Sequence, residues 1–148
     1  MVGNDPPAGK RMRCLLGFAG MIRVGSIDHV AIAVHDVRAS AAWYMDLFGL
    51  ERRFDDVWGD EPPVMVCAGE TCVALFPTEG ETSVAPGRGA IAMRHLAFVV
   101  DRANFELARS ELSERGIGWE FADHEVAHSI YLSDPDGHRI ELTTYELG

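Results

Sequence analysis

Two stretches of the chain place a histidine at the start of an alternating run of apolar residues. They are SIDHVAIAV, residues 26–34, and MRHLAFVV, residues 93–100. Alternate side chains of a β-strand face opposite sides of its sheet. One face of each stretch is bulky and carries Val30, Ile32, Val34, Leu96, Phe98 and Val100. The other face carries mostly small side chains beside His29 or His95, so the pattern predicts two strands with room for a ligand next to each histidine.

Each of these strands leads into a helical pattern with similar boundaries. The apolar periodicity predicts helices over VRASAAWYMDLF, residues 37–48, and RANFELARSELSER, residues 102–115. An aspartate that can cap the first turn precedes each helix, and a glycine suited to the left-handed C-terminal position follows it. These boundary residues are Asp36, Asp101, Gly49 and Gly116.

Three short runs typical of strands follow each helix. In the first half they cover residues 51–58, 63–68 and 71–77, and in the second half residues 118–123, 128–133 and 138–145. The chain therefore contains the order βαβββ twice, which indicates an internal duplication. The predicted fold class is α+β, with two βαβββ modules.

The duplication defines the expected domain organisation. Residues 1–21 are interpreted as a flexible N-terminal extension, and residues 22–148 as one domain. Within that domain, module 1 covers about residues 26–77 and module 2 about residues 90–146, and residues 78–89 have the Gly, Pro, Ser and Thr content of a linker. The apolar patch LLGFAG is shorter than the ~7–15 residues of a signal peptide, and no segment approaches the ~18 apolar residues of a membrane span.

The net charge and the cysteines indicate which binding partners and which cellular compartment suit this chain. The formal net charge of −10 argues against binding to nucleic acid or to an anionic membrane surface, because both need clustered Lys and Arg. The three cysteines, Cys14, Cys67 and Cys72, lack the spacing of a metal site. They are predicted to be reduced thiols that pack as small apolar side chains, as is usual in the cytoplasm.

A carboxylate in the last predicted strand adds a third candidate ligand. The tetrad DPDG, residues 134–137, is a strong turn signal, and Glu141 in the following strand shares a face with Arg139 and Thr143. A buried carboxylate is costly unless it is paired or bound to a metal. Two neutral imidazoles and one carboxylate form a set that holds a divalent metal with open positions, so His29, His95 and Glu141 are the predicted metal ligands.

These motifs resemble the vicinal-oxygen-chelate superfamily, which includes glyoxalases, extradiol dioxygenases, bleomycin-resistance proteins and fosfomycin-resistance enzymes. The resemblance covers about residues 26–145, and HSIYLSDPDGHRIELTTY is its most specific part. It implies an open eight-stranded cup built from both modules around one metal ion. The ligands that it implies fall on His29, His95 and Glu141. It also implies a small-molecule substrate and a homodimer, with the modules paired within one chain or exchanged between two.

Departures from the family narrow the choice of reaction. Many glyoxalases have a fourth ligand, a Glu on the last strand of the first module, and here the matching position is Val73 or Ala74. Fosfomycin transferases place a Thr two residues after the first His, where this chain has Ala31. Extradiol dioxygenases carry a Tyr ten residues before the Glu and a His slightly earlier, and this chain has Tyr131 and His124. The match is partial, because a second base His has no clear counterpart.

The leading hypothesis is a metal-dependent extradiol-type dioxygenase that uses Fe(II) or Mn(II), with Tyr131 and His124 as catalytic residues. Tyr131 would donate a hydrogen bond to an oxygen held at the metal, or simply fill space with its hydroxyl at the rim. His124 would act as a general acid or base, or be a solvated loop residue. The alternatives are a glyoxalase-type lyase or isomerase with Ni(II) or Zn(II), a metal-free drug-binding protein, and a structural dimer with a vestigial site.

Overall fold

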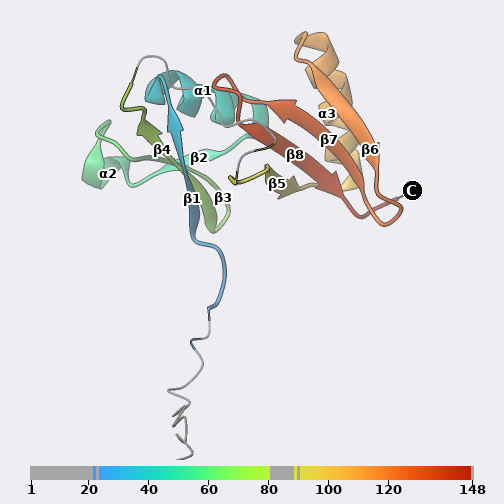
Figure 1. The fold of residues 1–148 in the computed structure, drawn as a ribbon, viewed down its shortest axis with the longest axis horizontal. Coiled ribbons are helices and arrows are strands. Elements are labelled where there is room, and N and C mark those ends of the chain that lie inside the picture. The colour runs from blue at the N-terminus through green and yellow to red at the C-terminus, as the bar shows by residue number, and fades with distance from the viewer. Residues whose placement is uncertain (1–21, 23, 81–88, 90, 148) are drawn as a thin grey trace, which may run out of the picture.

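The computed structural model describes residues 22, 24–80, 89 and 91–147. The expected N-terminal extension, residues 1–21, and most of the expected linker lie outside these residues. The described chain forms two four-stranded sheets, coloured from blue to green and from yellow to red along the sequence (Figure 1). This confirms the predicted α+β class with two modules of the same strand order.

The elements alternate as the repeat predicts, with one short extra helix. Module 1 contains β1 (His29–Val34), α1 (Val37–Phe48), β2 (Glu51–Arg53), α2 (Asp55–Trp58), β3 (Val64–Ala68) and β4 (Thr71–Pro77). Module 2 contains β5 (Leu96–Val99), α3 (Arg102–Glu114), β6 (Trp119–Asp123), β7 (His128–Ser133) and β8 (Arg139–Thr144). His29 is the first residue of its strand, and His95 immediately precedes β5.

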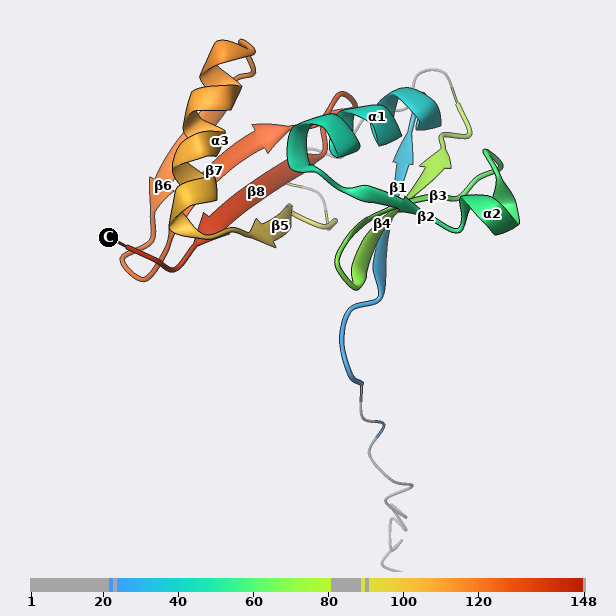
Figure 2. The same ribbon diagram turned by 180° about the vertical axis from the view of Figure 1, so that it is seen from behind.

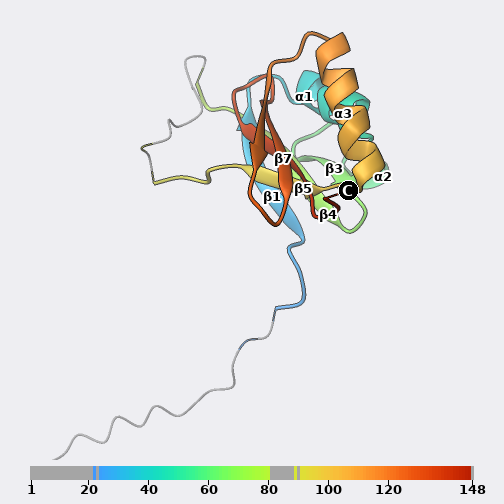
Figure 3. The same ribbon diagram turned by 90° about the vertical axis from the view of Figure 1, so that its right-hand side faces the viewer.

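Both sheets have the same topology. Their strand orders are β1-β4-β3-β2 and β5-β8-β7-β6, in which the first two strands run parallel and the remaining neighbours antiparallel. The helices α1 and α3 lie on the same side of the two sheets, in front of them in Figure 2 and to the right of them in Figure 3. Each sheet therefore has one face under a helix and one face turned the other way, which carries the predicted ligands.

The hydrophobic core lies on the helix side and joins the modules. It contains the bulky faces of β1, β3 and β4 together with Ile130, Ile140 and Leu142 of module 2. Helix α1 connects the halves, because Phe48 packs on Phe98 of β5 with ring centroids 5.7 Å apart. Burial of one continuous apolar cluster thus supports both sheets.

The caps confirm the predicted starts of both helices and the predicted end of α1, whereas α3 ends at Glu114, one residue earlier than predicted. The carboxylate of Asp36 accepts a hydrogen bond from the Ala39 amide at 2.9 Å, and that of Asp101 accepts one from the Asn104 amide at 2.8 Å. Gly49 follows α1 with φ of 65°. This left-handed conformation is the reason for a glycine at that position.

The predicted strand over residues 51–58 was wrong beyond residue 53. Phe54 has φ of 68°, which breaks the extended backbone, and residues 55–58 form the helical turn α2. Arg52 stabilises this turn, since its guanidinium donates to the Gly59 carbonyl at 2.8 Å and to Asp60 at 3.0 Å. Alternation alone did not reveal that side-chain contacts would favour a turn here.

The DPDG turn of module 2 docks on module 1. The buried Tyr44 hydroxyl donates to Asp134 at 2.8 Å. Asp136 accepts hydrogen bonds from the His35 amide at 3.0 Å, from the His35 ring at 2.5 Å and from the Ser40 hydroxyl at 3.2 Å. The predicted turn therefore also contributes polar contacts to the junction between the modules.

Candidate metal centre

Two of the three predicted ligands meet on the helix-free face of module 2. His95 Nε2 lies 2.8 Å from Glu141 Oε2. Glu141 is only 7% exposed, although it sits on a sheet face that is otherwise partly open. The burial of a carboxylate at this position agrees with the reasoning that selected it from the sequence.

Ser129 of β7 completes the surroundings of this carboxylate. Its hydroxyl donates to Glu141 Oε1 at 2.5 Å, and Ser129 is itself fully buried. The hydrogen bond fixes one carboxylate oxygen while the other faces His95. Hydrogen-bonded partners of this kind orient metal ligands. Sequence reasoning gave Ser129 no role, although its strand parity with Tyr131 was visible in the sequence.

The two predicted catalytic residues lie in contact beside this pair. Tyr131 is directly opposite Glu141 in the β7–β8 ladder, and its ring packs edge-on against the His95 ring. His124 Nε2 lies 3.2 Å from the Tyr131 hydroxyl. His124 and Tyr131 therefore form a short polar chain that begins at an exposed histidine and ends at the carboxylate.

The same surroundings act on the acidity of Tyr131. Desolvation, followed by a hydrogen bond and charge repulsion from Glu141, raises the pKa of the Tyr131 phenol above its usual value. Ser129 opposes this effect through a hydrogen bond, and Arg139 opposes it through the positive charge of its guanidinium, which lies 4.7 Å above the Tyr131 ring. The phenol is thus a hydrogen-bond donor near neutral pH.

The third predicted ligand, His29, lies in the other module. Its Nδ1 is 2.6 Å from Asp28 Oδ2, an arrangement that favours the proton on Nδ1 and leaves Nε2 as an acceptor. Among the described residues, no three His, Cys, Asp or Glu side chains gather closely enough to hold a metal ion. His29 therefore does not join His95 and Glu141 within one chain.

The donor groups themselves fit a divalent metal ion. His95 and Glu141 already converge, Ser129 supports the carboxylate, and the ring of His29 carries the carboxylate partner typical of ligating histidines. Two imidazoles and one carboxylate suit Fe(II), Mn(II), Ni(II) or Zn(II). Within a single chain, however, His29 does not come close enough to His95 and Glu141 to share a metal ion with them.

The strand register identifies the position in module 1 that corresponds to Glu141. Glu141 pairs with Ala97, the second residue after His95. In module 1 the second residue after His29 is Ala31, and it pairs with Ala74. Of the two candidates left open by the sequence, Val73 and Ala74, the matching residue is therefore Ala74, which has no ligating group. Val73 belongs to the core on the opposite face.

The prediction of reduced cysteines was wrong for two of the three. Cys67 of β3 and Cys72 of β4 form a disulfide, with their Cα atoms 4.0 Å apart. They are opposite each other in the β3–β4 ladder, a proximity that sequence spacing alone did not reveal. Cys14 lies outside the described residues. Cys67 and Cys72 are buried with Met65 and Ala74 on the face that carries His29.

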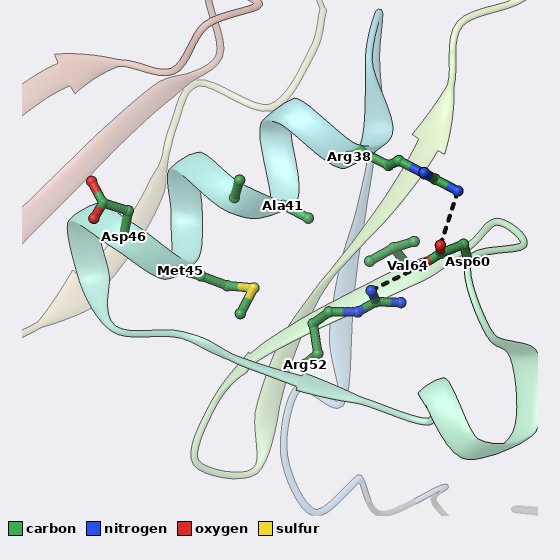
Figure 4. A pocket seen from close by; sticks show the side chains of 8 residues that line it. Arg38, Ala41, Met45, Asp46, Arg52, Asp60 and Val64 are labelled. Carbon is green, nitrogen blue, oxygen red and sulfur yellow. Dashed lines mark hydrogen bonds and ion pairs between the residues drawn. The ribbon is translucent and has the colours of Figure 1, made fainter.

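A separate open groove lies on the helix side of module 1, between α1 and β2. Ala41, Met45 and Val64 form its apolar part (Figure 4). At one end Arg38 and Arg52 both contact Asp60, at 2.9 and 3.0 Å. These two arginines hold the pKa of Asp60 below its usual range, mainly through the hydrogen bond from Arg52. The groove is on the opposite face from His29 and is not part of the candidate centre.

Comparison with known protein families shows the superfamily to which the chain belongs. The profile of the Glyoxalase/Bleomycin resistance protein/Dioxygenase superfamily matches residues 26–142, which include both modules and all three predicted ligands. The chain belongs to this superfamily. In the described part of the chain, no helix is long and apolar enough to cross a membrane.

Individual relatives differ in activity. The chain is 31% identical over 118 residues to the glutathione transferase FosA of Serratia marcescens, covering 79% of each protein. It is 26% identical over 117 residues to a catechol-2,3-dioxygenase of Bacillus subtilis, of which it spans only 40%, with 78% of this chain covered.

Solved structures of other proteins have the same fold as this chain. A glyoxalase/dioxygenase from Nostoc punctiforme superimposes with a TM-score of 0.67 at 22% identity, covering 97% of this chain and 99% of that one. A lactoylglutathione lyase from Agrobacterium tumefaciens gives a TM-score of 0.63 at 22% identity, with 82% and 94% covered. At this identity the likeness supports the fold alone.

Proposed function

We propose that the protein is a metal-dependent enzyme that acts on a small substrate with two neighbouring oxygen atoms. The observation that carries the proposal is the contact between His95 and the buried carboxylate of Glu141, 2.8 Å apart, beside Tyr131 and His124. When bound, a divalent ion supplies Lewis-acid polarisation of both substrate oxygens. A structural sheet face would not need a buried carboxylate with this set of partners.

The centre is completed by His29 from a second copy of the chain. Within one chain the three ligands do not gather, and the helix-free faces leave apolar side chains open, such as Val99 at 72% exposure. Exposed apolar surface of this kind favours association. A two-fold dimer in which module 1 of each copy faces module 2 of the other would cover it and form two centres.

A complementation experiment tests this assembly. His29→Ala and Glu141→Ala should each lose bound metal. When the two variants are unfolded and refolded together, half of the dimers are mixed, and one of their two centres has all three ligands. The refolded mixture should then regain about one quarter of the wild-type metal content. No recovery would contradict a centre shared between chains.

The residues of this chain divide the chemistry between them. Glu141 and His95 hold the ion, and Ser129 keeps the carboxylate oriented. Tyr131 donates a hydrogen bond to a substrate oxygen and thereby positions the substrate. His124, exposed and 3.2 Å from the Tyr131 hydroxyl, moves a proton between this hydroxyl and solvent.

The reaction that these residues suit best is an extradiol-type dioxygenation with Fe(II) or Mn(II). Two imidazoles and a single carboxylate leave positions for a bidentate substrate and for dioxygen. The absence of a ligating group at Ala74 and the contact between Tyr131 and His124 both support this choice. Similarity to a catechol-2,3-dioxygenase is consistent with it.

Thiol transfer is the second candidate, because the chain covers 79% of a glutathione transferase at 31% identity. Ala31 stands against it, since fosfomycin transferases place a threonine at this position. A glyoxalase-type lyase with Ni(II) or Zn(II) also remains among the proposals, and so does a metal-free drug-binding protein. The protein's cytoplasmic location remains a prediction.

Replacement of Glu141 tests the metal centre. Glu141→Ala should weaken metal binding by more than about 100-fold, because even the loss of a residue that only orients a ligand costs about 10–100-fold. Elemental analysis of the purified proteins measures the effect. Glu114→Ala, on the helix side of module 2, is the matched control and should keep wild-type metal content. Unchanged metal in Glu141→Ala would sink the proposal.

The reaction is tested by anaerobic reconstitution with Fe(II), followed by catechols under oxygen. Oxygen uptake with a yellow ring-opened product is the expected result, and Tyr131→Phe should lower the rate by about 10²–10⁴-fold if the phenol assists proton transfer. No uptake across a catechol panel, with turnover of fosfomycin and glutathione or of a thiol hemithioacetal, would assign the protein to one of the alternatives.

A further inference from the structure

The disulfide of module 1 lies in the same row of side chains as the candidate ligand His29. In the β1–β4 register His29 is paired with Cys72, and in the β3–β4 register Cys72 is paired with Cys67. The three strands are neighbours in one sheet (Figure 1). Because paired residues point to the same face, the His29 imidazole and the disulfide belong to one row on the face proposed to line the metal centre.

The disulfide is not needed to join these strands. Residues 67 and 72 are only five positions apart and are already linked by the β3–β4 hairpin. A cross-link across so short a loop removes little chain entropy, so its contribution to stability is at the low end for disulfides. Its position beside His29 therefore calls for another explanation.

Module 2 has no such pair at the equivalent positions. Counting from Glu141 and its counterpart Ala74, the residue two positions earlier is Arg139 in β8 and Cys72 in β4. Their ladder partners are Ser133 and Cys67. The cysteines thus belong to the module that supplies one histidine and no carboxylate, and Ala74 packs beside them without adding a ligating group.

We propose that the Cys67–Cys72 pair controls the metal centre through its redox state, with Cys72 as an additional metal ligand when it is reduced. The inference rests on the proposed metal centre. A dithiol, or two small thiols, would transfer two electrons and two protons to the disulfide and become a disulfide itself. The Cys72 thiol then releases its proton to solvent, and its thiolate sulfur binds the metal ion beside His29 Nε2.

Cys72 rather than Cys67 fills this role because Cys72 is the direct neighbour of His29, while Cys67 is one strand further away. The hairpin that joins them, residues 68–71, is exposed and gives a reductant access to the otherwise buried sulfur atoms. In the reduced protein a soft sulfur ligand occupies a position that a chelating substrate requires. In the oxidised protein that position stays open.

Thiol titration of the full-length protein is the first measurement. Three cysteines and one disulfide leave 3 − 2 = 1 free thiol per chain before reduction. Titration in denaturant should therefore find one thiol before, and three after, treatment with a dithiol. Three thiols in protein purified without reductant and exposed to air would overturn the proposal.

Cobalt(II) spectroscopy is the second measurement. Reduced protein loaded with Co(II) should show a thiolate-to-cobalt charge-transfer band in the near ultraviolet that oxidised protein lacks. Cys72→Ser should abolish the band, whereas Cys67→Ser should retain it, which separates the neighbour of His29 from its partner. Cys14→Ser removes the third thiol from consideration. Identical spectra for oxidised and reduced protein would overturn the proposal.

The two proposals fail in different ways. If oxidised protein binds Co(II) and loses it in Glu141→Ala, the proposed metal centre stands whatever the sulfur band shows. If oxidised protein does not bind Co(II), the proposed metal centre is wrong. A sulfur-to-cobalt band in the reduced protein would then come from a site without Glu141, and it should persist in Glu141→Ala. A band that is lost in both Cys72→Ser and Glu141→Ala supports the two proposals together.

Discussion

The two modules share a scaffold but not a surface chemistry. Strand order, register and the aspartate N-caps of the helices agree between them. On the helix-free face, however, the positions that hold Glu141 and Tyr131 in module 2 hold Ala74 and Met65 in module 1. Hydrogen bonding between strands determines the scaffold and depends little on most side chains. The helix-free faces of the two sheets can therefore carry different functional groups.

The difference divides the proposed site into two walls. Module 2 contributes a carboxylate, a phenol and an exposed imidazole, all in hydrogen-bond contact with a neighbour. Module 1 contributes one imidazole and a wall of small and sulfur-containing side chains, which includes Ala74 and Met65. A substrate held between them would present its oxygens to module 2 and its apolar part to module 1.

The strongest test of the comparison places a carboxylate in module 1. Ala74→Glu should destabilise the metal-free protein by about 3–5 kcal/mol, because it buries an unpaired charge. Added Zn(II) or Co(II) should restore much of the loss by binding only to the folded state. Thermal unfolding with and without metal measures both effects.

Val73→Glu is the matched control for this experiment. Val73 is equally buried but faces the core under α1. It should be destabilised to a similar degree, and metal should not rescue it. Equal rescue of both variants, or of neither, would mean that Ala74 is not the counterpart of Glu141.

The junction between the modules is tested by Tyr44→Phe. Burial, together with the negative charge of Asp134, raises the pKa of the Tyr44 phenol far above its usual value, so it donates to Asp134 at all ordinary pH values. Loss of a hydrogen bond to a charged group should cost about 1.5–3 kcal/mol of unfolding free energy. Urea unfolding measures it, and Tyr145→Phe, at an exposed position, should change stability by less than about 0.5 kcal/mol. A similar loss in both variants would contradict a special role for the junction.

Acid should loosen the same junction through Asp136. Burial opposes ionisation of this carboxyl group, but the amide and ring of His35 and the Ser40 hydroxyl outweigh it, and they hold its pKa below the usual range. A group with a lowered folded-state pKa binds protons more weakly than in the unfolded chain. Its stabilisation is therefore complete above the unfolded value of about 3.9 and is lost as pH falls through the folded value.

The pH dependence of urea unfolding between neutral and strongly acid pH checks this expectation. Asp136→Asn should show a shallower loss of stability in acid than the wild type, because the titrating group is gone. Asp56→Asn, on the exposed turn α2, should keep the wild-type slope. Parallel curves for wild type and Asp136→Asn would contradict the assignment.

The smallest effects concern the equivalent helix caps. Asp36→Ala and Asp101→Ala should each cost about 1 kcal/mol, because each removes one bond to a first-turn amide. Asp101 also accepts a bond from the Asn104 side chain at 2.9 Å, so its loss should be slightly larger. Urea midpoints measure both. A difference above about 2 kcal/mol would show that the two caps are not equivalent.

Local signals in the sequence predicted most of the scaffold. Helix α1 has the predicted bounds because an aspartate, an apolar stripe and a glycine agree on them. The turn at Gly137, with φ of 90°, was likewise visible as DPDG. These features depend on residues close together in the chain, where the pattern is informative.

Pairing across strands was harder to predict. The choice between Val73 and Ala74 depends on a one-residue register, and a shift of one residue exchanges the two faces of a strand. The disulfide between Cys67 and Cys72 depends on the same register. The separation of His29 from the other two ligands depends on how the modules pack, which alternation along the chain does not encode.

The long reach of the DPDG turn has a consequence for how the protein is made. The bonds from Asp134 and Asp136 to Tyr44, Ser40 and His35 span 90, 96 and 101 residues. During synthesis the first module leaves the ribosome well before the residues that satisfy its Tyr44 hydroxyl have been translated. Until then α1 exposes the aromatic face that Phe98 and the turn later cover, and an apolar face left open in this way is prone to aggregation. A gene truncated before codon 134 would therefore yield a nascent chain that depends on chaperones, even though its own sheet is complete.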